Sequence, residues 1–136
     1  MKPKLCAAGV QLRDQVDTWF PDRNTKSPEG WLGDSRHASR KSDHNPDQFG
    51  WVRGLDINAG LESSNSLAPY LADQIRIAAK QDKRISYVIY NGRICSKILN
   101  WKWRKYKGIN PHKRHIHISF TTLGDLNGTP FDIPLI

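Results

Sequence analysis

The chain has 136 residues, 38% of them hydrophobic and 25% charged, which fits one globular domain whose core needs no disulfide bridges. No apolar run approaches the roughly 18 residues of a membrane-spanning helix, so no transmembrane segment is predicted. The net charge of +8 favours a polyanionic partner, either nucleic acid, anionic lipid or an anionic cell envelope. Cys6 and Cys95 match no metal-binding spacing, so two buried free thiols are favoured, while a disulfide stays open.

The amino-terminal stretch predicts a helix and no export signal. Apolar residues recur at helical spacing from Leu5 to Phe20, and Pro21 ends the pattern. The apolar stretch before Arg13 is too short for a signal peptide. We therefore expect synthesis in a cytoplasm, so that action outside it needs a separate route of release.

Loops alternate with strand and helix patterns in the middle of the chain. Residues 21–30 are polar and rich in Pro and Gly, as in a loop. Strand character follows at Trp51–Val52 and Leu55–Ile57. Residues 67–80 carry apolar side chains at helical spacing, with Lys80 in the last turn, and predict a second helix.

A β-hairpin is predicted at Asn91-Gly92. The β-branched and aromatic run Ile85–Tyr90 precedes this dipeptide and Arg93–Cys95 follows it, which is the strongest short signal for a two-residue turn. Residues 99–108 then interleave Trp and Tyr with Lys and Arg. These aromatic side chains could stack on sugars or bases, or pack under the sheet.

The densest cluster of reactive side chains lies in Asn110–Phe120, which holds three of the five histidines, His112, His115 and His117. From His115 onward polar residues alternate with apolar ones, which predicts a half-buried strand with His115 and His117 on one face. Two adjacent imidazoles on a strand form half of a metal site. We infer an α+β domain with N-terminal helices and a small antiparallel sheet that carries this site.

The remaining ligands are expected in Ser42–Asn58, which supplies His44 and Asp56. A catalytic zinc ion usually has three protein ligands and one open position. Asp56 stands between two apolar residues, and a carboxylate in an apolar strand needs a partner because burial of an unpaired charge is costly. A metal ion is one such partner, and Arg53 is the alternative.

These motifs resemble those of the zinc peptidases of peptidoglycan. That family includes the D-alanyl-D-alanine carboxypeptidases, the penicillin-insensitive murein endopeptidases and the phage L-alanyl-D-glutamate endolysins. The resemblance spans roughly residues 33–120 of a single domain over 1–136, with 121–136 as a C-terminal tail. It is strongest at SDHNPD, GLDI and WRKYKGINPHKRHIHIS.

The resemblance implies one Zn²⁺ per chain, held by His44, Asp56 and His117. It places His112 and His115 beside the zinc-bound water and the substrate, as catalytic residues. It also implies hydrolysis of an amide bond in peptidoglycan stem peptides or cross-links. The setting would be a monomeric phage endolysin that a holin releases onto the anionic cell wall, without an obligate nucleic-acid partner. Which bond is cut stays open.

Two features depart from the family pattern. Eleven residues separate His44 from Asp56, where the family commonly has the shorter spacing HxxGxAxD, so an inserted loop is implied. Many members place a catalytic Glu or Asp three residues before the last ligand, and Arg114 stands there in this chain. The base would then be His112, with His115 assisting or orienting.

Substrate-binding residues are expected just before His44. Arg36 and Arg40 could bind a peptide carboxylate through two parallel hydrogen bonds, although a solvated basic loop is the alternative. Ser42 could donate a hydrogen bond near the metal or cap the turn. His37 is interpreted as structural or as part of the substrate wall.

Two other functions compete with the peptidase. The basic charge and the run Asp43-His44-Asn45 also suit a metal-dependent His-Asn-His nuclease, but that motif needs its last histidine on a helix. A non-catalytic module that binds a polyanion would need no metal, and it would leave Asp56 unexplained.

Overall fold

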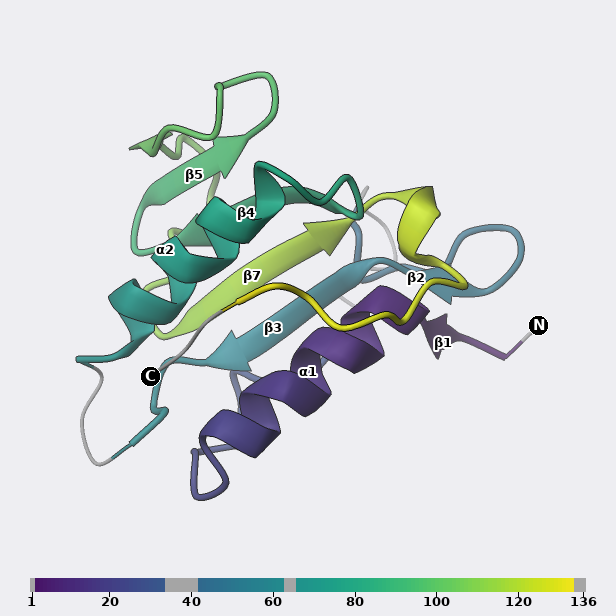
Figure 1. Ribbon diagram of the computed structural model, residues 1–136, viewed down its shortest axis with the longest axis horizontal. Coiled ribbons are helices and arrows are strands. Elements are labelled where there is room, and N and C mark those ends of the chain that lie inside the picture. Colours follow the sequence, from purple (N-terminus) through teal and green to yellow (C-terminus); the bar gives the residue numbers. More distant parts are fainter. Residues whose placement is uncertain (1, 34–41, 63–65, 134–136) are drawn as a thin grey trace.

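The computed structural model describes residues 2–33, 42–62 and 66–133, which form a sheet with helices on one face (Figure 1). Five antiparallel strands follow the order β3-β7-β4-β5-β6. Their bounds are Gly54–Asn58 (β3), Ile85–Tyr90 (β4), Arg93–Ser96 (β5), Arg104–Lys105 (β6) and His115–Phe120 (β7). A separate parallel pair consists of Lys4–Leu5 (β1) and Trp51–Val52 (β2). The helices are Ala7–Trp19 (α1) and Ala68–Ala79 (α2), with a 3₁₀ turn at Thr122–Gly124.

The predicted α+β class with a small antiparallel sheet is confirmed. Both predicted helices form, and the strand patterns correspond to β2, β3, β4, β5 and β7. The second helix follows β3 in the chain, so helices and strands are interleaved. Among the residues described, neither helix is long and apolar enough to cross a membrane.

Each helix buries one side against the sheet. Leu12 and Val16 of α1 and Leu71 and Ile75 of α2 are fully buried in a common core. Burial of each such side chain contributes about 1.5–3 kcal/mol, so packing rather than helix propensity stabilises this layer. Cys6 and Cys95 lie in the same core as free thiols, which confirms the interpretation that they are unpaired.

The hairpin between β4 and β5 has the predicted turn. Asn91 has φ of 50° and Gly92 has φ of 77°, and Tyr90 is the register partner of Arg93. Positive φ at both central residues is the condition for a type I′ turn, whose twist matches that of the flanking strands.

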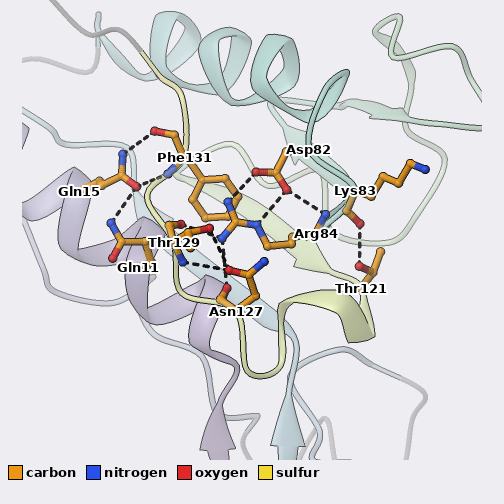
Figure 2. A network of polar contacts seen from close by, with 9 residues as sticks. All are labelled: Gln11, Gln15, Asp82, Lys83, Arg84, Thr121, Asn127, Thr129 and Phe131. Carbon is orange, nitrogen blue, oxygen red and sulfur yellow. Dashed lines mark hydrogen bonds and ion pairs between the residues drawn. The ribbon is translucent and has the colours of Figure 1, made fainter.

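Arg84 fastens the segment after β7 to the sheet (Figure 2). Its buried guanidinium contacts the Asp82 carboxylate at 2.6 Å and donates to the carbonyl oxygens of Asn127 at 3.1 Å and Thr129 at 2.7 Å. It also lies 3.9 Å above the ring of Phe131. One cation thus holds three points of an otherwise irregular segment.

Gln15 of α1 holds the same segment from the other side (Figure 2). Its amide donates to the Phe131 carbonyl at 3.0 Å and accepts from the Phe131 N–H at 2.8 Å. The segment therefore runs between α1 and α2 and closes the helical layer, with Phe131 and Ile133 buried in the core (Figure 1).

Replacing Arg84 by Met should lower the free energy of unfolding by about 2 kcal/mol or more. The variant keeps the aliphatic stem but leaves two carbonyls and a carboxylate without their donor. Chemical denaturation measures the change. Lys83→Met is the matched control because its side chain is exposed, and this control should stay within about 0.5 kcal/mol of the wild type. Equal stability of the two variants would contradict the role given to Arg84.

Asp82 should make stability depend on pH in the acid range. Burial raises the pKa of Asp82, but the hydrogen bonds from Arg84 outweigh this effect and hold the pKa below its usual range. A lowered folded pKa contributes stability above about pH 4, and this contribution is lost as pH falls through the folded pKa. Asp82→Asn should therefore flatten the acid limb of an unfolding series, and an acid limb as steep as that of the wild type would contradict this role of Asp82.

Candidate metal centre

Three side chains converge on the face of the sheet opposite the helices: His44, Asp56 and His117. Their ligand atoms all lie within 4.8 Å of one another. His44 Nε2 lies 3.2 Å from Asp56 Oδ2, and His117 Nδ1 lies 2.9 Å from Asp56 Oδ1. A cluster of two imidazole nitrogens and one carboxylate is a donor set that could hold a metal ion.

The sheet fixes two of the three residues. Asp56 of β3 and His117 of β7 are direct register partners, so the sheet itself sets the spacing between them. On the other side of β3, the Gly30 N–H donates to the Asp56 carbonyl at 3.0 Å and the Asp56 N–H donates back at 2.7 Å. The Asp56 backbone is therefore held from both sides.

His44 comes from a loop that two other segments position. Its Nδ1 is 2.8 Å from the Trp31 carbonyl, and its own carbonyl accepts from the Gly33 N–H at 2.9 Å. A carbonyl oxygen only accepts, so Nδ1 carries the proton and Nε2 of the neutral ring is left for a metal ion. Gly54 permits this approach, since a Cβ there would lie 3.0 Å from the Asp43 carbonyl carbon.

A chain of hydrogen bonds orients His117. Its Nε2 lies 2.8 Å from the hydroxyl of Ser119, and that hydroxyl donates to Asp43 Oδ2 at 2.8 Å. The Tyr87 hydroxyl donates to the same oxygen at 2.6 Å. Because Ser119 gives its single proton to Asp43, it accepts from His117 Nε2–H, and Nδ1 is left facing Asp56.

The negative charge of Asp56 favours binding of a cation at this centre. Burial raises the pKa of Asp56, but the close contacts with His117 and His44 outweigh burial and hold the pKa of this carboxyl far below its usual range. Burial lowers the pKa of His44, and the contact with Asp56 reverses this effect and leaves the pKa raised. Asp56 is thus a carboxylate whose nearest partners are imidazoles.

Arg53, the alternative partner of Asp56, points elsewhere. Its guanidinium contacts Asp47 Oδ2 and Asp125 Oδ2, each at 2.7 Å. Asp47 belongs to the loop that separates His44 from Asp56, so Arg53 links this loop to the 3₁₀ turn that follows β7. Arg53 is therefore not the partner of Asp56, and this alternative to a metal ion is excluded.

A cavity of about 670 Å³ opens beside the three ligand atoms. It is also lined by Glu29, Asp43, Tyr87, Tyr106, His112 and His115. A metal ion held by these three candidate ligands would therefore have open space beside it.

His112 lies over the other histidines at the edge of the cavity. Its ring centroid is 4.6 Å from that of His115 and 5.4 Å from that of His117. Its φ of 56° is stabilised by a turn in which the His112 N–H donates to Asn110 Oδ1 at 2.9 Å. Its Nδ1 is shielded from solvent and has no hydrogen-bond partner among the residues described.

The environment keeps His112 uncharged. Burial lowers the pKa of His112 to about 4, and the neighbouring His117 and His115 act in the same direction. Burial also lowers the pKa of His115, whose Nε2 lies 3.7 Å from Asp56 Oδ1, beyond hydrogen-bond range. Two neutral imidazoles thus flank the three ligand atoms, and each can accept a proton or donate an N–H.

The other predicted site residues divide into two groups. Ser42 lines the cavity, and its hydroxyl accepts from the His44 N–H at 3.2 Å. Arg36 and Arg40, as well as His37, lie outside the described residues.

The strand that carries the histidines was expected to be half-buried, and this detail is wrong. All six residues of β7 are buried, because the segments around Trp31 and His44 pack over the second face of the sheet. Ser119, Asp43 and Tyr87 were not identified as site residues. The alternation that placed His115 and His117 on one face also placed Ser119 there, so this signal was present in the sequence.

Comparison with known proteins gives no relative. No family model, no curated protein and no solved structure matches the chain. The function is therefore inferred from the cluster of His44, Asp56 and His117 and from the cavity that it faces.

Proposed function

We propose that the chain is a zinc peptidase that hydrolyses an amide bond in the stem peptides or cross-links of peptidoglycan. One observation supports this most directly: the ligand atoms of His44, Asp56 and His117 lie within 4.8 Å of one another beside a cavity. The substrate class rests on the resemblance of the motifs around these residues to those of the peptidoglycan peptidases.

Zinc is the proposed metal because two imidazoles and one carboxylate with an open position form a usual ligand set of catalytic zinc. When bound, zinc would lower the pKa of its water to about 7 and polarise the scissile carbonyl. Other divalent ions also fit such a ligand set, so the metal has to be identified in the purified protein.

His112 is the proposed proton acceptor. Arg114 occupies the position where a carboxylate base would stand, and His112 is neutral with an unpartnered Nδ1 beside the ligand cluster. His112 would take the proton of the attacking water or donate an N–H to the developing oxyanion. His115 would orient the substrate carbonyl from the neighbouring position on β7.

The strand placement of the histidines disfavours the nuclease alternative. His115 and His117 lie on β7, whereas a His-Asn-His motif needs its last histidine on a helix. The setting we propose is a monomeric phage endolysin that reaches the cell wall through a holin.

Metal content and activity of the purified protein test this function. The wild type should contain about one zinc ion per chain and release peptide termini from purified peptidoglycan. Both properties should be lost in His117→Gln and Asp56→Asn, which keep the side-chain shape but remove a ligand. Mass spectrometry of the products names the bond. A metal-free wild type, or one that degrades DNA and leaves peptidoglycan intact, would sink the proposal.

Ser119→Ala should lower zinc affinity by about 10–100-fold, because His117 loses the acceptor that fixes its ring. Thr121→Ala is the matched control, since it removes a hydroxyl that donates to the Lys83 carbonyl at 2.7 Å and does not line the cavity. Competition with a chromogenic chelator measures both affinities. If the two variants bind zinc equally well, Ser119 has no role in orienting His117.

A further inference from the structure

The positive charge of the protein is concentrated in one segment. Residues 85–124 hold eight of the 21 Lys and Arg residues and none of the 13 Asp and Glu residues, so the rest of the chain holds 13 of each sign. The net charge of +8 therefore belongs entirely to this segment, which spans β4 to β7. We name its cations the basic rim: Arg93, Lys97, Lys102, Arg104, Lys105, Lys107, Lys113 and Arg114.

These cations differ from the arginines that stabilise the fold. Arg23, Arg53, Arg76 and Arg84 each contact a carboxylate within 2.8 Å. All eight cations of the basic rim are exposed, and none of them forms an ion pair in the described part of the chain. The basic rim is therefore available to an external anion.

The basic rim adjoins the cavity of the metal centre. Gly92, in the turn after β4, is hydrogen-bonded to two later segments. Its carbonyl accepts from the Tyr106 N–H at 2.8 Å, and its N–H donates to the Pro111 carbonyl at 2.7 Å. These bonds bring the end of β6 beside the segment that carries His112. Tyr106 and His112 line the cavity, and Lys105, Lys107 and Lys113 are their direct neighbours in the chain.

Protection of a sheet edge does not account for the whole basic rim. β6 is an edge strand, and lysines on such strands prevent pairing with other chains. That role covers Arg104 and Lys105, but Lys107 and Lys113 lie outside any strand. Edge protection therefore leaves Lys107 and Lys113, the cations that follow β6 and flank His112, without an explanation.

We propose that the basic rim docks the carboxylate-bearing peptidoglycan polymer and holds it while one stem peptide enters the cavity. Free carboxylates of stem peptides supply the complementary charge. The identity of the polymer rests on the function proposed above, whereas the location of the docking surface rests on the charge distribution and the contacts around the cavity.

Two charge-matched variants test the proposal. The first replaces Lys102, Arg104, Lys105 and Lys107 of the basic rim by Gln. The second replaces four exposed lysines elsewhere, Lys2, Lys4, Lys80 and Lys83, by Gln. Each variant loses four of the eight net positive charges, so a difference between them reports position rather than total charge. Binding is measured by co-sedimentation with insoluble purified peptidoglycan, in EDTA, so that hydrolysis does not contribute.

The basic-rim variant should bind peptidoglycan about tenfold more weakly at low ionic strength, and the control should bind nearly as well as the wild type. Amidation of the peptidoglycan carboxylates should weaken wild-type binding to the same degree. Thermal unfolding verifies the fold. A smaller basic-rim variant, Lys107→Gln with Lys113→Gln, leaves β6 unchanged. If the fourfold variant does not fold, this double variant should still show part of the loss of peptidoglycan binding.

Two outcomes would overturn the proposal. The first is equal binding of peptidoglycan by the basic-rim variant and its control. The second is loss of duplex DNA binding in the basic-rim variant with peptidoglycan binding retained, which would assign the surface to nucleic acid. Because binding is measured without metal, a failure of the zinc-peptidase function would leave this readout intact, and the two failures can be distinguished.

Discussion

The carboxylate of Asp56 is the constraint on which the site depends. It lies in a strand with hydrogen-bonded neighbours on both sides, and its closest partners are imidazoles rather than a guanidinium. A half-buried carboxylate of this kind has to be compensated. The loop of His44 and the register of His117 both follow from that requirement. A divalent cation would balance the charge while leaving the rings neutral.

Basic residues have two roles in this fold: some pair with carboxylates and stabilise it, and others stay exposed and unpaired. Arginines with carboxylate partners hold irregular segments to the sheet, as Arg53 does for the loop before Asp56 and Arg84 for the segment after β7. Eight of the cations without such partners form the basic rim and belong to the segment that spans β4 to β7. Composition alone gives one number for the net charge, and only the pairing shows which charges remain available.

The sequence predicted those features that depend on local pattern. Helical spacing, the Asn91-Gly92 turn and the alternation around His117 act over a few residues, and each corresponds to an element of the structure. The contact of Asp43 with Ser119 joins residues 76 positions apart, and its contact with Tyr87 joins residues 44 apart. No periodicity encodes such distances, so Asp43 and Tyr87 could not be found in this way, whereas the alternation along β7 does place Ser119 beside His117. The burial of both faces of β7 was missed for the same reason.

The two hydrogen bonds between the Gln15 side chain and the Phe131 backbone have a consequence for synthesis of the protein. These residues are 116 positions apart, and Phe131 and Ile133 fill the space between the helices. A nascent chain therefore cannot complete its core while the last of these residues is still inside the ribosomal tunnel. Until then the apolar face of the sheet is uncovered at its centre, and the partly made domain is open to aggregation and proteolysis. Folding of this chain is completed after the candidate metal-binding residues have already been translated.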